Sequence, residues 1–213
     1  MVNLAAEKTI DLYKDFGWKK VFARIRFWDA PFIEIEKLVP KTGVIVDLGC
    51  GEGLFANYLA LSSPRREIYG IEIDKRRITQ ANRSLPNTNF LYGDITKINI
   101  PLADTIILFH VLHHLKSFKE QEELLKKCVQ KLKRSGKLII AEVEPGFDVK
   151  YVIAYLTDHF LVPWIFNHRF YDPIFFRKKD DWQELLIDLG FKIKVLNASR
   201  NKPFPHVIFV CNK

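Results

Sequence analysis

Between residues 44 and 143, short apolar runs alternate with segments of helical periodicity. This alternation is typical of repeated β–α–β units, which build a parallel sheet with helices on both faces. Strands are expected over residues 44–48, 68–73, 89–92, 105–109 and 138–143. Because crossovers between parallel strands are right-handed, the carboxyl ends of these strands should line one crevice. The pattern predicts an α/β fold of the doubly wound, Rossmann-like kind.

The segments between these runs predict helices over residues 54–61, 75–85 and 122–132. Asp74 is expected to cap the second helix, and Ser135 and Gly136 are expected to end the third. Farther along, Asp180 is expected to cap a helix that ends at Leu189 and Gly190. Apolar runs over residues 191–196 and 206–211 then predict two strands. The expected result is a seven-stranded, mostly parallel sheet with an antiparallel hairpin strand at its carboxyl-terminal end.

Composition narrows the class of protein. The 213 residues suit one domain, and 48% hydrophobic with 27% charged residues excludes a disordered chain. No apolar run approaches the roughly 20 residues that a membrane helix needs, and the first residues do not resemble a signal peptide. The cysteines Cys50, Cys128 and Cys211 are odd in number and widely spaced, which favours reduced thiols in a cytoplasmic protein.

A glycine-rich turn follows the first expected strand. Gly49, Gly51 and Gly53 alternate with other residues, so a ligand can approach the main chain closely there. A dinucleotide-binding turn would have its third glycine at position 54, where this chain has Leu54. The negative charge of Asp47 would also oppose a pyrophosphate, whereas it suits an ammonium or sulfonium group.

The motif Asp-Leu-Gly-Cys-Gly-Glu-Gly over residues 47–53 resembles the first motif of class I S-adenosylmethionine-dependent methyltransferases, and the later elements follow that family's order. The resemblance covers residues 40–145 and, as a terminal helix and hairpin, residues 180–213. It implies S-adenosyl-L-methionine as the cofactor. The residues that it assigns to the cofactor site are Asp47, Gly49, Gly51, Gly53, Glu72, Ile73, Asp94, Ile95 and His110.

Two of these residues have specific implied roles. Glu72 would accept hydrogen bonds from the ribose hydroxyls, and Asp94 would accept one from the exocyclic amine of adenine. Each has a structural alternative: Glu72 as a solvated strand end, and Asp94 as the first residue of an Asx turn beside Gly93. Asp74 is the other possible ribose ligand, although we interpret it as a helix cap.

Three histidines follow the fourth expected strand, at positions 110, 113 and 114. A histidine titrates near neutral pH, so His113 or His110 is the candidate base that removes a proton from the methyl acceptor. The structural alternative is that one packs in the core and another caps a turn. The spacing of His110, His113 and His114 also resembles the metal-binding acid-x-x-acid-His motif of quinone-biosynthesis O-methyltransferases, which makes a metal site a weaker hypothesis.

The rest of the chain predicts added layers on a single domain over residues 1–213. A helical cap (1–39) precedes the cofactor-binding core (40–145), and an aromatic-rich helical insertion (147–182) precedes the terminal helix and hairpin (183–213). The insertion would either wall an apolar acceptor site or form the core of an added layer. Basic and aromatic residues mix there and at 18–28, which suits peripheral contact with an anionic membrane surface.

The sequence therefore predicts an enzyme that transfers a methyl group by in-line displacement to a small-molecule or lipid-like acceptor. An RNA methyltransferase is the alternative suggested by the net charge of +8, but the excess of bases is spread along the chain, which makes nucleic acid a weaker candidate. A non-catalytic cofactor-binding module is the third hypothesis.

Overall fold

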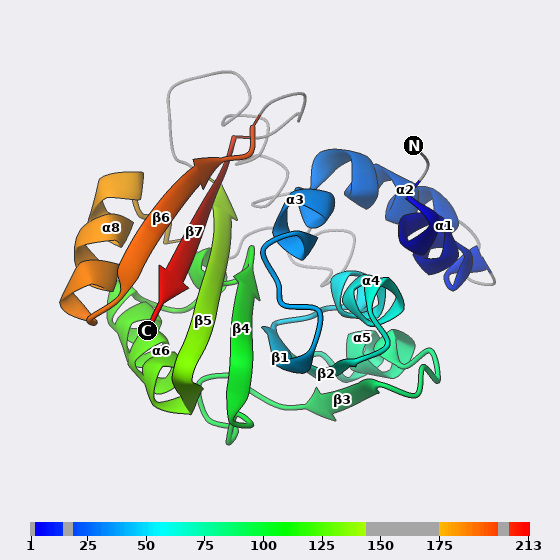
Figure 1. The fold of residues 1–213 in the computed structure, drawn as a ribbon, viewed down its shortest axis with the longest axis horizontal. Coiled ribbons are helices and arrows are strands. Elements are labelled where there is room, and N and C mark those ends of the chain that lie inside the picture. Colours follow the sequence, from blue (N-terminus) through cyan, green and yellow to red (C-terminus); the bar gives the residue numbers. More distant parts are fainter. Residues whose placement is uncertain (1–2, 15–18, 144–174, 200–204) are drawn as a thin grey trace.

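The computed structural model describes residues 3–14, 19–143, 175–199 and 205–213. Seven strands form one sheet in the order β3-β2-β1-β4-β5-β7-β6 (Figure 1). The strands are β1 (Gly43–Leu48), β2 (Arg66–Glu72), β3 (Thr88–Tyr92), β4 (Ala103–Phe109), β5 (Leu132–Val143), β6 (Lys192–Asn197) and β7 (His206–Asn212). The first five are parallel, and β7 runs antiparallel to both β5 and β6. The predicted α/β fold class is confirmed.

Helices cover both faces of this sheet. They are α1 (Leu4–Asp11), α2 (Lys19–Asp29), α3 (Phe32–Glu36), α4 (Leu54–Ser62), α5 (Lys75–Ala81), α6 (Phe118–Lys131) and α8 (Lys179–Asp188), with a 3₁₀ turn η2 (Leu112–His114). The helices α1, α2 and α3 lie within the segment expected to be a helical cap. Among the described residues, no helix is both long and apolar enough to cross a membrane.

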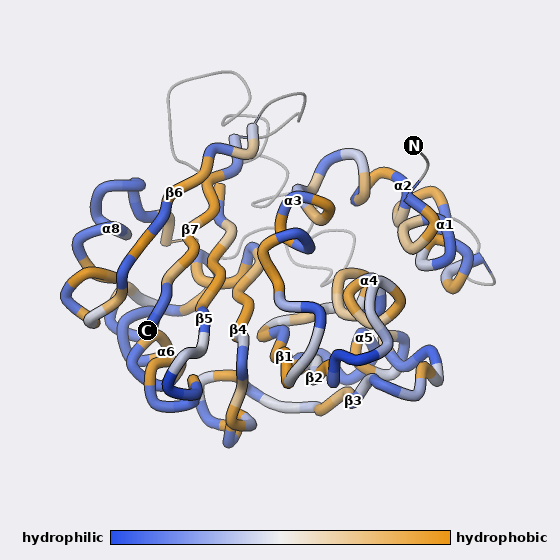
Figure 2. Tube along the Cα trace, viewed as in Figure 1, coloured by the Kyte–Doolittle hydropathy of each residue, from blue (hydrophilic) through white to orange (hydrophobic). Residues whose placement is uncertain are grey.

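Successive residues of the central strands enter two separate cores. Val46 of β1 packs in a cluster with residues of α6 and α8, such as Leu125 and Trp182. Its neighbour Ile45 packs in a second cluster with residues of α3 and α4, such as Ile35 and Leu59. Because both faces of the strand are buried, its sequence is apolar except for Asp47 and does not alternate. Figure 2 shows apolar runs along the middle of the sheet.

Two predicted helix ends are wrong. The helix after Asp74 ends at Ala81, four residues before the expected end, because Asn82 is already extended. The helix expected to start at residue 122 begins at Phe118, since the Ser117 side chain accepts a hydrogen bond from the Glu120 amide and caps it. The predicted cap by Asp74 itself is confirmed, through bonds from the amides of residues 76 and 77.

Two further predictions of local structure are wrong. Ser135 and Gly136 do not end α6; they lie inside β5, which starts at Leu132 and shifts its register against β4 in this stretch. Asp180 does not cap α8, because the helix starts at Lys179 and Lys178 occupies the cap position without a side-chain bond. Asp180 lies instead in the first turn, where a negative charge still interacts favourably with the helix dipole.

The described residues include little of the aromatic-rich segment predicted over residues 147–182. Residues 144–174 lie outside them, and the description resumes at residue 175. The predicted division of the chain into a cap, a core, an insertion and a terminal unit therefore stays a prediction. The terminal helix and hairpin are formed by α8, β6 and β7.

Candidate active site

The glycine turn after β1 requires glycine for two reasons. Gly49 and Gly53 both have φ of +73°, in the left-handed region that residues with a Cβ avoid. A Cβ on Gly53 would also lie 2.7 Å from the Cβ of Ala81, and one on Gly49 would lie 2.5 Å from Cγ2 of Val111. The turn therefore brings its backbone close to both α5 and the loop after β4.

Glu72, at the end of β2, joins that strand to the glycine turn. One carboxylate oxygen accepts a hydrogen bond of 2.8 Å from the amide of Gly51, and the other accepts bonds of 2.9 Å from the amides of Ile73 and Asp74. Its side chain is buried, so it is not a solvated strand end. Because a carboxylate offers about four lone-pair positions, three bonds leave room for one further donor.

Asp47 is a second buried acid at the same end of the sheet. It lies on β1 beside Gly70 of β2. Burial, and next the negative charge of Glu72, raise the pKa of Asp47 to about 7. Two carboxyl groups in this buried place favour a cation, since a bound positive charge would stabilise both ionised forms.

The other predicted cofactor residues have different surroundings. Ile73 is exposed and offers an apolar surface next to Glu72. Asp94 forms the Asx turn that was the structural alternative, because its Oδ1 accepts bonds from the amide (2.9 Å) and hydroxyl (2.6 Å) of Thr96. Although burial opposes the change, these bonds and Lys97 lower the pKa of Asp94. The Ile95 side chain packs in the core, which leaves its backbone for any contact with a ligand.

The N-terminal cap reaches the glycine turn through Glu52. The hydroxyl of Tyr13 donates a hydrogen bond of 2.6 Å to the Glu52 carbonyl, and Lys19 forms an ion pair of 3.0 Å with its carboxylate. Tyr13 is buried, and burial raises the pKa of its phenol to about 12, so the hydroxyl keeps its proton and remains a donor. These contacts place α1 and α2 against the turn.

His113 is held by a buried acid that the sequence did not identify. Its Nδ1 contacts a carboxylate oxygen of Glu142 on β5, and the other oxygen accepts bonds from the amides of Val111 (3.2 Å) and Leu112 (2.9 Å). The imidazole also stacks on Phe176, with ring centroids 4.8 Å apart. Because the carboxylate accepts the hydrogen on Nδ1, a neutral His113 carries its lone pair on Nε2. In the sequence, the available signal for Glu142 was a single acid within the apolar run that forms the end of β5.

His110, the first residue after β4, lies in a second histidine pair. Its φ of +52° is unusual for a residue with a side chain, and its amide donates to the carbonyl of Ala141 at 2.9 Å. Its Nε2 lies 3.1 Å from Nδ1 of His206, a residue the sequence also did not identify as functional. Burial, and then the nearby His206 and Arg26, hold the pKa of His110 well below its usual value.

The three-histidine metal hypothesis gains no support from these contacts. His114 is exposed, His113 binds Glu142 through Nδ1, and His110 binds His206 through Nε2. Within the described ranges, no group of three or more His, Cys, Asp or Glu side chains is arranged to hold a metal ion.

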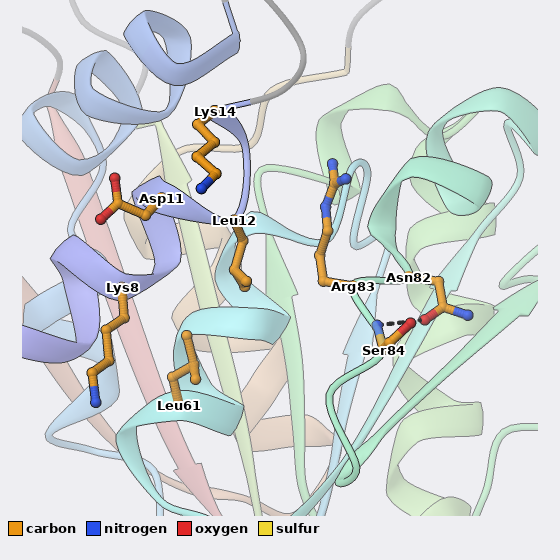
Figure 3. Close-up of a pocket in the computed structure, with 8 residues that line it drawn as sticks. All are labelled: Lys8, Asp11, Leu12, Lys14, Leu61, Asn82, Arg83 and Ser84. Carbon is orange, nitrogen blue, oxygen red and sulfur yellow. Dashed lines mark hydrogen bonds between the residues drawn. The ribbon is translucent and has the colours of Figure 1, made fainter.

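The glycine turn, Glu72, His110 and Glu142 lie at the carboxyl ends of β1, β2, β4 and β5, the strands labelled in Figure 1. His206 joins them because β7 is antiparallel to β5 and therefore begins where β5 ends. A separate surface hollow contains none of them: it lies between α1, the end of α4 and the chain after α5 (Figure 3). Its lining residues are Lys8, Asp11, Leu12, Lys14, Leu61, Asn82, Arg83 and Ser84.

The basic segment expected to contact a membrane is largely neutralised by ion pairs. Besides the pair of Lys19 with Glu52, Lys20 pairs with Asp11 and Arg26 pairs with Asp29, both at 2.8 Å. Apolar residues of α2 are nevertheless exposed, among them Val21, Ile25 and Trp28. Contact with a membrane stays a prediction, and these ion pairs reduce the positive charge available for it.

Comparison with known proteins gives the class of this chain. Residues 46–140 match the family model described as a methyltransferase domain. Over these residues, and with the observed strand order, the chain is similar to class I S-adenosylmethionine-dependent methyltransferases.

Individual relatives match part of their length. An uncharacterised methyltransferase of Bacillus cytotoxicus is 32% identical over 133 residues, which are 61% of this chain and 58% of the relative. A demethylmenaquinone methyltransferase of Thermotoga maritima is 27% identical over 122 residues, 57% of this chain and 52% of the relative. This chain therefore covers less than two thirds of either relative.

A solved structure matches more completely. The magnesium protoporphyrin IX methyltransferase of Synechocystis, determined with bound SAH, superposes with a TM-score of 0.65 at 19% identity. The match covers 100% of this chain and 89% of that protein. At this identity the similarity concerns the fold.

Proposed function

We propose that this chain is an enzyme that transfers a methyl group from S-adenosylmethionine to a small-molecule or lipid-like acceptor. The observation that carries the proposal is the buried Glu72 carboxylate, which bridges the end of β2 and the amide of Gly51 in the glycine turn. The family match over residues 46–140 supports it. A relative named for demethylmenaquinone, a small molecule, favours this class of acceptor over nucleic acid.

The residues around the turn suit the chemistry of this cofactor. The ionised form of Asp47 would stabilise its ammonium or sulfonium charge, and the left-handed turn at Gly49 and Gly51 would present backbone atoms to it. The remaining lone-pair position of Glu72 suits one ribose hydroxyl. The exposed side chain of Ile73 offers an apolar surface to the adenine ring. Asp94 would use Oδ2, because Oδ1 is occupied by Thr96.

The bound cofactor supplies an activated methyl group on a sulfonium sulfur. The residues of this chain would align the acceptor with that methyl group and exclude water, which accounts for most of the required catalysis. Where the acceptor loses a proton as the new bond to carbon forms, Nε2 of His113 would receive it, while Glu142 holds the Nδ1 proton. His113 is preferred to His110 as the base because the pKa of His110 is held far below neutrality.

Calorimetric titration with S-adenosylhomocysteine tests the cofactor site. We expect sub-millimolar binding to the unmodified chain, and at least about tenfold weaker binding to Glu72→Gln, because an amide cannot replace both accepting oxygens. Glu67→Gln is the matched control, since it makes the same change at an exposed position of the same strand. Absence of binding to folded, unmodified protein would reject the proposal.

Transfer of a labelled methyl group into a cell extract tests the acceptor class. We expect the label in the lipid or metabolite fraction. Label in RNA, with retention on RNA that weakens steeply with salt, would support the RNA alternative instead. Cofactor binding with no label in any fraction would support a non-catalytic module.

A further inference from the structure

A chain of buried contacts connects His110 with the N-terminal cap. Nε2 of His110 lies 3.1 Å from Nδ1 of His206, and Nε2 of His206 lies 3.2 Å from the backbone carbonyl oxygen of Asp29, at the end of α2. The planes of the two imidazoles differ by 18°, and their ring centroids are 5.0 Å apart. His206 and Asp29 are 1% and 3% exposed, so water does not compete for these contacts.

The hydrogens in this chain follow from what each atom can do. A carbonyl oxygen only accepts, so Nε2 of His206 must carry a hydrogen. In a neutral His206, Nδ1 is then the acceptor, and the hydrogen between the two rings belongs to Nε2 of His110. In a neutral His110, Nδ1 is therefore the atom with the lone pair.

Neutral rings are consistent with the charges that face them. The Asp29 carboxylate lies 3.8 Å from Nε2 of His206, but it already pairs with Arg26 at 2.8 Å. The pair of Asp29 with Arg26 beside His206 carries no net charge. Burial, the largest cause, and the nearby Arg26 oppose a positive charge on His110.

We propose that His206 is a positioning residue that fixes His110 in the neutral form with hydrogen on Nε2, so that Nδ1 of His110 accepts a hydrogen bond from a hydroxyl or amine of the methyl acceptor. The role of the acceptor rests on the function proposed above. The assignment of the hydrogens does not, because it depends on the contacts from Asp29 to His110 alone. Together with His113, whose lone pair lies on Nε2, the site then holds two imidazoles of opposite tautomer.

The position of His110 agrees with this role. It follows β4 directly, at the sheet edge that also bears the glycine turn. Its left-handed backbone persists because its amide is bonded to Ala141 and its ring is bonded to His206. Backbone strain of this kind is common at ligand sites, where the surrounding structure can hold it.

Nitrogen NMR of the ¹⁵N-histidine-labelled full chain tests the tautomer without any ligand. The signals are assigned with single His→Gln variants. At neutral pH we expect His110 to carry hydrogen on Nε2 and to show a scalar coupling across the bond to Nδ1 of His206. Hydrogen on Nδ1 of His110, as a cationic His206 would impose, would overturn the proposal.

Two substitutions at position 206 separate positioning from packing. His206→Phe keeps a ring but removes the acceptor, so His110 should shift to a mixture of tautomers. His206→Asn keeps an acceptor where Nδ1 lies, so the Nε2–H form should persist. Unchanged His110 signals in a folded His206→Phe protein would contradict the proposal. If that variant does not fold, the coupling in the unmodified chain and the His206→Asn spectrum still test the tautomer of His110.

Kinetics with an acceptor found in the labelling experiment test the second half of the proposal. We expect His206→Phe to raise the KM for the acceptor at least about tenfold, and His206→Asn to restore most of it. An unchanged KM would reject the role toward the acceptor. Failure of the unmodified chain to bind S-adenosylhomocysteine would instead reject the proposed function and leave the tautomer assignment intact.

Discussion

At the scale of single residues, the site combines acids and imidazoles whose ionisation is set by burial. Asp47, Glu72, His110 and His113 are identifiable in the sequence, because motifs and strand ends mark them. The sequence does not identify Glu142 or His206, which are far away along the chain. Each becomes a site residue only because its strand pairs beside another: β5 lies next to β4, and β7 lies next to β5.

Asp47→Asn should stabilise the protein without ligand at high pH. The pKa of Asp47 is raised from 3.8 to about 7, so its ionisation destabilises the folded chain progressively as the pH rises between these values. The upper bound is about 4 kcal/mol, from about 1.4 kcal/mol per pKa unit. Urea unfolding of both proteins at pH 5 and pH 8 measures it. The gain should be larger at pH 8, and an equal gain at both values would contradict the raised pKa.

The same titration predicts the pH dependence of cofactor binding. The ammonium group of S-adenosylhomocysteine should favour ionised Asp47, so the affinity of this ligand for the unmodified chain should rise as the pH increases through about 7. In Asp47→Asn the rise should disappear and the affinity should be weaker. Calorimetry with S-adenosylhomocysteine from pH 5.5 to 8 gives both profiles, and a flat profile for the unmodified chain would exclude Asp47 from the site.

Glu142→Gln should cost stability and activity together. The Glu142 carboxylate receives bonds from two amides and from His113, and a buried donor left without a partner costs about 1–3 kcal/mol. Loss of the support for His113 should lower kcat by about 10²-fold or more for an acceptor that must lose a proton. Glu123→Gln, an exposed change on α6, is the control. An unchanged kcat would remove His113 as the base.

At the scale of secondary structure, the sequence predicts the sheet better than the helix ends. The first four strands lie within two residues of their expected limits. The limits of β5 and α6 differ more because Leu132 pairs with Ala103 of β4 ahead of a register shift, and regular pairing resumes at Lys137, which local turn chemistry does not reveal. Ser117 was the available signal for the start of α6, since a serine three residues before Glu120 is a typical helix cap.

Two glycine substitutions separate backbone strain from crowding at the turn. Gly190 has φ of +85°, and no atom lies within 4 Å of a Cβ added there. Gly190→Ala should therefore lower the free energy of unfolding by about 1–2 kcal/mol, from backbone strain alone. Gly53→Ala adds a contact of 2.7 Å with Ala81, so it should cost about 1–3 kcal/mol more and weaken cofactor binding. Urea unfolding measures both. Equal losses would mean that α5 moves away freely.

At the scale of the whole molecule, ligand binding should appear as global stabilisation. S-adenosylhomocysteine at 100 times its Kd should add about 2.7 kcal/mol to the free energy of unfolding. For a chain of this size that corresponds to a rise in Tm of about 5–11 °C. Thermal unfolding by circular dichroism measures the rise, which Glu72→Gln should reduce at the same ligand concentration and Glu67→Gln should not. A rise in Tm of equal size in Glu72→Gln would show that the Glu72 carboxylate does not contribute to binding.

The sequence by itself determined the fold class and the glycine turn, because apolar periodicity and left-handed glycines are local properties. It also indicated Asp47 and Glu72, because Asp47 lies near the end of β1 and Glu72 ends β2, both beside that turn. Only the tertiary structure decided the partners of the histidines. Glu142 and His206 approach them through the pairing of distant strands, and hydrogen bonds over 29 and 96 residues leave no local pattern. The tautomers, and with them the chemistry available at this edge of the sheet, depend on those long-range contacts.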